Sequence, residues 1–244
     1  MKSVRLHSPG DLRLQDEPIP APGKTQKLVK VKVVGICGSD LHWFSSAGIG
    51  DARLVKPLVL GHEFSGETED GRRVAVDPAI PCGLCEYCRR GNPNLCANLL
   101  FAGHGDQDGA LREWLAWDER MLYPLPDAIS DSEGAMLEPL GVAILAVDLG
   151  KLRTGMTVGV FGCGPIGLLV VQLARLSGAV NIIATDVLPH RVEAAKSFGA
   201  THAFLAPGKT EENIELEMNS ILAASGGPGV DVAFEVAGEQ EAAH

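Results

Sequence analysis

The sequence predicts an α/β protein with an irregular, β-rich first domain over residues 1–150 and a doubly wound, parallel-sheet second domain over residues 151–244. Up to about residue 150 the chain is rich in Pro and Gly and carries short β-type runs, such as Lys27–Val34 and Arg73–Val76, which indicate a mostly antiparallel domain with long loops. After Gly155, strand-length apolar runs alternate with helical runs, which is typical of a parallel sheet covered by helices. We therefore expect the domain boundary near Lys151–Gly155.

The second domain is expected to contain strands and helices that alternate along the chain. Apolar runs predict strands at 157–161, 181–186, 202–205 and 230–237. The runs between them predict helices at 165–177, 189–198 and 211–224. The last residues, 238–244, resemble the beginning of another helix.

Composition and charge exclude several classes of function. With 45% hydrophobic and 21% charged residues, the 244-residue chain has the composition of a globular protein. A net charge of -10 argues against nucleic acid as a partner, because phosphate binding needs clustered Lys and Arg. The chain begins without a signal peptide and contains no apolar stretch of membrane-spanning length, so we expect a cytoplasmic protein with no membrane partner.

Four of the six cysteines form a compact cluster with metal-ligand spacing. Cys82, Cys85, Cys88 and Cys96 follow the pattern C-x2-C-x2-C-x7-C, which lets one loop turn four thiolates toward a tetrahedral centre. Clustered thiols in a chain without an export signal indicate metal ligands rather than disulfides. Zinc in a closed, structural site is the expectation, although an iron–sulfur cluster also uses four thiolates. A nucleic-acid-reading zinc finger is excluded because no helix of reading length separates the ligand pairs.

A second, open metal site is predicted from two separate segments, at residues 35–42 and 61–63. A catalytic zinc needs about three protein ligands and one free position for water or substrate. Cys37 and His62 are suitable ligands, and either Glu63 or Glu138 completes the set. Each motif alone is weak evidence for a metal site, because a Gly-His-Glu sequence is often a turn and a lone cysteine is often a small core residue.

Two polar residues near Cys37 are candidates for proton transfer. Ser39 is placed to take a proton from the substrate alcohol, and His42 is placed to pass it to solvent.

A glycine-rich loop predicts dinucleotide binding. The sequence Gly162-Cys163-Gly164-Pro165-Ile166-Gly167 follows a predicted strand and opens a predicted helix. The first glycine makes the tight turn, the second lets the backbone approach a pyrophosphate, and the third packs helix on strand. Asp186 ends the next strand, where a carboxylate accepts hydrogen bonds from the adenosine ribose and repels a 2′-phosphate. NAD is therefore favoured over NADP, although Arg191 lies close enough to soften that preference.

Together these motifs resemble the zinc-containing medium-chain alcohol dehydrogenases, and among them the polyol branch that includes sorbitol and L-idonate dehydrogenases. The stretches that carry the resemblance are 35–42 (GICGSDLH), 61–66 (GHEFSG), the cysteines of 82–96, 138–140 (EPL) and the glycine loop. They cover the chain from near its N-terminus to its last residues. The resemblance implies a GroES-like catalytic domain followed by a Rossmann domain.

The resemblance also implies a role for individual residues. Cys37 and His62 look like catalytic zinc ligands, and Asp40 like the carboxylate that orients a ligating histidine. Glu63 looks like the adjacent carboxylate that binds the metal directly or through water, while Glu138 falls where many alcohol dehydrogenases have a third, cysteine ligand, and a glutamate there is typical of the polyol branch. The implied reaction oxidises a secondary alcohol, a polyol or sugar acid, by removing its proton through Ser39 and His42 and passing hydride to NAD.

In the family the cofactor domain has six strands, of which four are expected here. The resemblance thus implies that about a hundred further residues complete the fold. Without them we expect the strand at 230–237 to be an apolar edge that associates with other chains. The alternative function is a non-catalytic fragment that binds zinc and a dinucleotide. When complete, the protein is expected to be a homo-oligomer, a dimer or tetramer.

Overall fold

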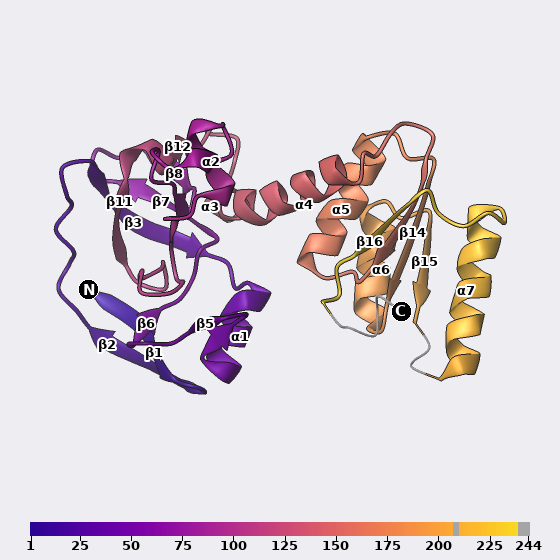
Figure 1. Ribbon diagram of the computed structural model, residues 1–244, viewed down its shortest axis with the longest axis horizontal. Helices are drawn as coiled ribbons and strands as arrows, with labels where there is room; N and C mark the ends of the chain where they lie inside the picture. Colours follow the sequence, from indigo (N-terminus) through magenta and orange to yellow (C-terminus); the bar gives the residue numbers. More distant parts are fainter. Residues whose placement is uncertain (207–209, 239–244) are drawn as a thin grey trace. The chain divides into compact units, whose positions relative to one another are not determined.

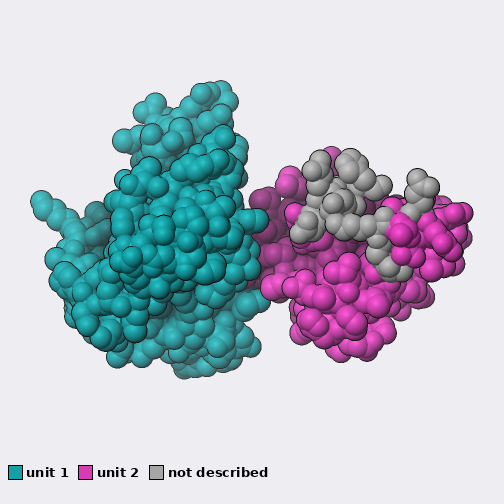
Figure 2. Space-filling model, turned by 90° about the horizontal axis from the view of Figure 1, so that it is seen from below, with its two compact units in different colours: residues 1–138 teal, residues 139–244 magenta. Residues whose placement is uncertain are grey.

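The structure is a computed structural model that describes residues 1–206 and 210–238. The chain forms two compact units, Met1–Glu138 and Pro139–His244 (Figure 2). The sequence placed the boundary at residue 150, whereas the units divide after Glu138. The reason is that Ala143 and Val147 of helix α4 (Leu137–Leu149) pack in the core of the second unit.

The centre of the first unit is a five-stranded antiparallel sheet (Figure 1). Its strands, in spatial order, are β11 (Trp114–Asp118), β3 (Gln26–Val34), β7 (Phe64–Thr68), β8 (Arg73–Val76) and β12 (Leu122–Pro124). The pairing of Val34 with Phe64 brings the end of β3 beside the start of β7. Since Cys37 follows β3 and His62 precedes β7, this register positions the predicted metal ligands next to each other.

A second sheet supports the same region. It contains β2 (Asp11–Asp16), β1 (Lys2–Ser8) and β6 (Leu58–Val59), and it packs with helix α1 (Gly38–Ser46) through Leu6 and Trp43. The remaining elements of the unit are short: β4 (Gly48–Ile49), β5 (Ala52–Arg53), β9 (Ala79–Ile80), α2 (Glu86–Arg89), η1 (Pro93–Leu95), β10 (Leu100–Phe101), η2 (Glu119–Met121) and α3 (Asp131–Ala135).

The second unit contains a parallel sheet with strand order β15-β14-β13-β16. The strands are β13 (Thr157–Phe161), β14 (Asn181–Asp186), β15 (His202–Leu205) and β16 (Val232–Glu235). Helices α5 (Pro165–Leu176) and α6 (Pro189–Phe198) pack together on one side, and α7 (Glu211–Ser225) contacts β14 from the other (Figure 1). The predicted α/β class is confirmed.

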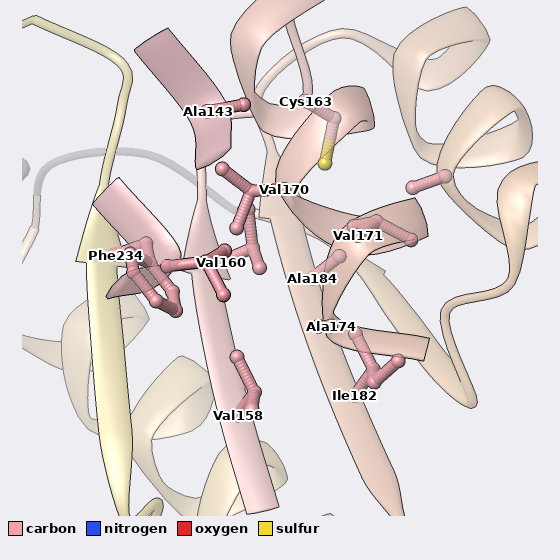
Figure 3. Packing of buried hydrophobic residues seen from close by; sticks show 12 residues of the cluster. Ala143, Val158, Val160, Cys163, Val170, Val171, Ala174, Ile182, Ala184 and Phe234 are labelled. Atoms are coloured by element: carbon pink, nitrogen blue, oxygen red, sulfur yellow. The ribbon is translucent and has the colours of Figure 1, made fainter. Parts of the chain in front are cut away.

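The core of this unit lies between the sheet and the helices. Val160 of β13 is in register with Ala184 of β14 and Phe234 of β16, and Val170 of α5 packs against them (Figure 3). These side chains are nearly or fully buried, which fixes β13, and the glycine loop that follows it, at the carboxyl edge of the sheet.

One predicted strand is shorter than expected. The prediction covered 230–237, but β16 spans only Val232–Glu235. The strand ends because the Glu235 carboxylate accepts hydrogen bonds from the N–H groups of Ala237 and Gly238, at 2.8 Å and 3.0 Å, and so holds a turn. Among the described residues β16 pairs with β13 alone. Part of the helix expected at 238–244 lies outside the described residues.

The helices of residues 1–206 and 210–238 include none that is long and apolar enough to cross a bilayer.

An ion-pair network in the first unit anchors the strand that leads to His62. Arg5 donates to both carboxylate oxygens of Asp108, each at 2.8 Å, and to Glu17 at 2.9 Å and 3.0 Å. The N–H of Val59 in turn donates to Asp108 at 3.1 Å. The segment 109–111 then pairs by backbone hydrogen bonds with 59–61, immediately before His62. The network therefore fixes residues 59–61, the segment of the chain that leads into the metal site.

This network predicts a pH-dependent contribution to stability. The hydrogen bonds from Arg5 lower the pKa of Glu17 from 4.5 to about 2. A lowered folded-state pKa stabilises the protein fully above pH 4.5, and this contribution is lost as the pH falls from 4.5 toward 2. Glu17→Gln should therefore reduce the free energy of unfolding by about 1–3 kcal/mol at neutral pH. Urea unfolding of both proteins across this pH range measures the difference, which should disappear near pH 2; an undiminished difference there contradicts the assignment.

Candidate metal and cofactor sites

The four clustered thiols converge on one point. The sulfur atoms of Cys82, Cys85, Cys88 and Cys96 all lie within 4.8 Å of one another. The Cys85 sulfur is 3.5 Å from that of Cys88 and 3.9 Å from that of Cys96. Zinc–sulfur bonds of about 2.3 Å in a tetrahedron place the sulfur atoms about 3.8 Å apart. The spacing of these sulfurs therefore fits a four-thiolate zinc site.

Backbone N–H groups point at these sulfurs. The Cys82 sulfur accepts from Leu84 at 3.5 Å and from Cys85 at 3.4 Å, and the Cys96 sulfur accepts from Cys82 at 3.3 Å. The bonds from Leu84 and Cys85 lower the pKa of Cys82 to about 6, which favours the thiolate. Desolvation, together with the Cys85 thiol, raises the pKa of Cys88 to about 12. A bound cation would offset the cost of holding four thiolates together in this cluster.

The open site forms where the two predicted segments meet. Ligand atoms of Cys37, His62 and Glu63 all lie within 4.8 Å of one another. Cys37 is the residue before α1, and His62 and Glu63 lead into β7. Gly35 leaves room for the Glu63 side chain, because a Cβ there would overlap the position of its carboxylate. The geometry brings together three of the four predicted ligands.

Glu138, the fourth predicted ligand, lies outside this set. Its side chain is half-buried and close enough to His62 and Glu63 for electrostatic interaction, but its carboxylate does not join the three convergent ligand atoms. Among the described residues the arrangement therefore favours Glu63 over Glu138 as the carboxylate ligand.

Asp40 connects the two segments that carry the ligands. Its side chain is buried, with 4% of its surface exposed. One carboxylate oxygen accepts from the N–H of Cys37 at 2.9 Å, and the other accepts from the N–H of Gly61 at 3.2 Å. The second oxygen also lies 3.8 Å from Nδ1 of His62. The carboxylate is thus placed where it can orient this histidine, as the sequence predicted.

The electrostatics of the open site favour a bound cation. Desolvation raises the pKa of Cys37, Glu63 and Glu138, and the nearby carboxylates add to this effect. The thiol and carboxylates therefore resist becoming negative together while no cation is present. A divalent cation would offset this cost, because its charge stabilises the deprotonated ligands. The donor set of thiolate, imidazole and carboxylate fits zinc.

The two predicted proton-transfer residues occupy different environments on α1. The Ser39 hydroxyl hydrogen-bonds to the Cys37 side chain and partly counteracts the effect of burial on the pKa of that thiol. His42 is one helical turn further on and is exposed. It lines a cavity of about 470 Å³. The pair therefore extends from the metal ligands to solvent.

Other residues of this cavity were not found from the sequence. Besides His42 it is lined by Ser46, Gly48, Ile49, Gly50 and Arg53. These residues form the end of α1 and the β4–β5 hairpin. No local motif identifies them, because the hairpin strands are only two residues long; the available signal was a Gly-x-Gly turn followed by an arginine.

The glycine loop has the geometry expected of a nucleotide-binding turn. Gly162 has a φ of +103°, and a Cβ there would lie 2.7 Å from the backbone nitrogen of Ala237. At Gly164, just before α5, a Cβ would approach only Arg191, at 3.9 Å, so the backbone is open to a ligand. At Gly167 a Cβ would overlap the carbonyl oxygen of Gly162. The three glycines thus match the predicted turn, approach and close packing, in that order.

The remaining predicted cofactor residues surround this turn. Pro165 and Ile166 begin α5, whose N-terminal N–H groups form an anion-binding end. Asp186 is buried, and its carboxylate accepts from the N–H groups of Cys163 at 2.7 Å and of Leu188 at 2.8 Å. Arg191 lies 3.7 Å from the same carboxylate. Asp186 therefore fixes the glycine loop as well as placing a negative charge beside it.

Comparison with known proteins identifies the family. Residues 23–127 match the family model of the alcohol dehydrogenase GroES-like domain, and residues 165–244 match the family model of zinc-binding dehydrogenases. Sorbitol dehydrogenase of Bacillus subtilis (strain 168) is 38% identical over 252 residues, covering 99% of this chain and 70% of that protein.

Two crystal structures of similar proteins contain a nicotinamide nucleotide. An alcohol dehydrogenase from Escherichia coli CFT073 complexed with NADH has a TM-score of 0.79 at 33% identity, covering 90% of this chain and 66% of that one. A zinc-binding dehydrogenase from Sinorhizobium meliloti 1021 bound to NADP has a TM-score of 0.84 at 34% identity. The match covers 99% of this chain and 71% of that one.

The chain therefore belongs to the zinc-dependent medium-chain alcohol dehydrogenase family, in its polyol dehydrogenase branch. The resemblance seen in the sequence is confirmed, as are zinc and a nicotinamide nucleotide as the cofactors of this family. The chain spans about 70% of the length of the sorbitol dehydrogenase.

The two metal sites should respond differently to mutation. Cys85→Ser should abolish zinc binding at the cysteine cluster and lower the thermal unfolding midpoint, because the cluster cannot hold its loop together without metal. His62→Ala should remove the zinc of the open site and NAD reduction while leaving the fold intact. Zinc analysis and thermal unfolding of the whole protein measure both effects, from an expected wild-type content of about two zinc ions. Equal destabilisation by the two substitutions contradicts the division into structural and catalytic sites.

Proposed function

We propose that the protein is a zinc-dependent dehydrogenase that transfers hydride from a secondary alcohol of a polyol or sugar acid to NAD. The observation that carries this proposal is the convergence of Cys37, His62 and Glu63 into an open three-ligand set. Three ligands leave a position at which a substrate oxygen can bind, whereas the four-thiolate cluster leaves none. The second unit supplies the nucleotide-binding turn that a hydride acceptor requires.

The residues of the chain divide the reaction between them. When bound, zinc polarises the substrate hydroxyl and the nicotinamide accepts the hydride. Ser39 Oγ accepts the proton of the substrate hydroxyl while it donates its own proton to the neutral ring of His42, and the exposed His42 ring then releases a proton to solvent. Asp40 holds Cys37 and His62 in place through its bonds to the N–H groups of Cys37 and Gly61. The N-terminus of α5 binds the pyrophosphate, and Asp186 binds the adenosine ribose.

The ligand set supports a polyhydroxy substrate. A carboxylate ligand such as Glu63 makes the metal more favourable to oxygen donors than a third thiolate would. A polyol or sugar acid offers several hydroxyl oxygens to such a centre. The sorbitol dehydrogenase relative agrees with this substrate class.

The proposal is tested by following NADH formation from a panel of polyols, sugar acids and simple alcohols with the whole, zinc-loaded protein. We expect turnover with polyhydroxy substrates and none after zinc removal. Zinc and NADH binding without turnover of any alcohol supports the alternative, a non-catalytic binding protein. The homo-oligomer and the cytoplasmic location remain predictions; light scattering tests the first and cell fractionation the second.

Asp186 should determine the choice of nucleotide. Asp186→Ser removes the buried charge that repels a 2′-phosphate, so kcat/KM for NADP relative to NAD should rise by about tenfold or more. Because Asp186 also accepts from Cys163 and Leu188, the substitution loosens the glycine loop, and thermal unfolding must be measured alongside. Asp186→Asn is the matched control, since it removes the charge but retains an acceptor. If neither variant changes the nucleotide preference, the ribose is bound elsewhere.

A further inference from the structure

The cavity beside His42 has the size of a small-molecule site. It has a volume of about 470 Å³, within the range of about 300–1,000 Å³ that small-molecule sites occupy. Ser39, His42 and Ser46 follow one another at intervals of three and four residues, so they share one face of α1. The cavity therefore continues the helix face that begins at the open metal site.

Arg53 is the cationic residue of this cavity, and the local fold fixes its position. Arg53 pairs with Gly48 in the β4–β5 hairpin. A Cβ at Gly48 would lie 2.6 Å from the carbonyl oxygen of Ala52 and 3.0 Å from the Arg53 side chain, so the close pairing of the hairpin requires a glycine here. The Arg53 guanidinium donates through Nη1 to the carbonyl oxygens of Gly50 and Ala52. These bonds position the guanidinium, and its Nε and Nη2 donate to no acceptor among the described residues, so they are available to a ligand.

Arg53 has no acidic partner within the part of the chain that the structure describes. Most other arginines of the first unit do: Arg5 and Arg112 pair with Asp108, Arg73 with Asp131, and Arg120 with Asp118. Arg53 lines the cavity, and the described residues of the cavity lining include no carboxylate that could neutralise the guanidinium charge. Its planar set of donors matches a carboxylate or a phosphate.

We propose that this cavity binds an oxyanion group of the substrate through Arg53, so that the enzyme acts on a polyhydroxy acid or a polyol phosphate in preference to a neutral polyol. The inference rests on the proposed function, because it assigns one end of the same substrate. The reacting hydroxyl lies at the metal end of α1, beside Ser39, and the oxyanion lies at the Arg53 end. The distance along α1 from Ser39 to Ser46 is about 10 Å. That is the scale of an extended sugar-derived chain rather than of a small alcohol.

The test compares three substrates with matched hydroxyl configuration: a hexitol, the corresponding hexonate and the hexitol phosphate. NADH formation by the whole, zinc-loaded protein gives kcat/KM for each. The wild type should favour one anionic substrate over the hexitol by about tenfold to hundredfold, the size of a charge-assisted bidentate contact. The favoured anion identifies the group as carboxylate or phosphate. Added salt should reduce the preference.

Arg53→Gln should reduce kcat/KM for the favoured anion at least tenfold more than for the hexitol, which separates anion binding from a general defect. Lys56→Gln is the charge-matched control, because Lys56 is exposed and does not line the cavity. It should leave the preference unchanged. Arg53→Lys keeps the charge but loses the planar donors, so it should retain only part of the preference.

A binding measurement keeps the inference testable apart from turnover. Titration calorimetry of the whole protein with the hexonate and with the hexitol phosphate should detect binding of one of them that Arg53→Gln removes and Lys56→Gln retains. Equal kcat/KM for the neutral and anionic substrates overturns the inference but leaves the proposed function standing. If the protein oxidises none of the three substrates, the proposed function is contradicted. The calorimetric comparison then still decides whether the cavity binds an anion. Anion binding that survives in Arg53→Gln overturns the inference.

Discussion

The open metal site depends on one buried carboxylate. The two segments that carry its ligands are separated by more than twenty residues, and the Asp40 carboxylate accepts hydrogen bonds from a backbone N–H in each of them. A buried carboxylate is costly unless its charge is compensated, so these two bonds and the nearby His62 imidazole fix its position. Once Asp40 is placed, Cys37 and His62 have little freedom to separate. The strand register between β3 and β7 brings Glu63 to the same point.

The cofactor turn is built with the same device. Asp186 is also buried, and it also accepts from two backbone N–H groups, those of Cys163 and Leu188. In both sites an aspartate at the end or beginning of a regular element fixes a neighbouring loop and contributes negative charge. In the proposed function, that charge favours a cation at the metal site and ribose hydroxyls over a phosphate at the cofactor site. Positioning and selectivity thus come from the same side chains.

The sequence predicted most of the second unit because its signals are local. Strand-length apolar runs alternate with helical ones, and the glycine loop identifies the turn after β13. The expected strand at 230–237 was too long because its end is set by a side-chain contact from Glu235, which apolar patterning does not reveal. The division after Glu138 depends on the packing of α4 in the second core, which is also a tertiary property.

The roles of the metal and cofactor residues remain predictions, but the proximity of the candidate zinc ligands was predictable, because zinc ligands and phosphate-binding glycines have characteristic spacings. The choice between Glu63 and Glu138 was not, since both are acidic and only the convergence of ligand atoms distinguishes them. The cavity containing Arg53 was missed for a similar reason: it is formed by a hairpin packed beside α1, and no sequence motif marks Arg53 as the arginine that lines it.

Zinc binding by Asp40→Asn tests the central role of Asp40 most directly. The substitution retains the shape of the side chain but removes its charge and one of its two acceptor oxygens. Metal content and competition with a chelator should show zinc retained at the cysteine cluster and affinity at the open site reduced by about 10–100-fold. Circular dichroism should show that the fold is preserved. Two zinc ions bound with unchanged affinities would contradict the account, because the open site would then assemble without the carboxylate.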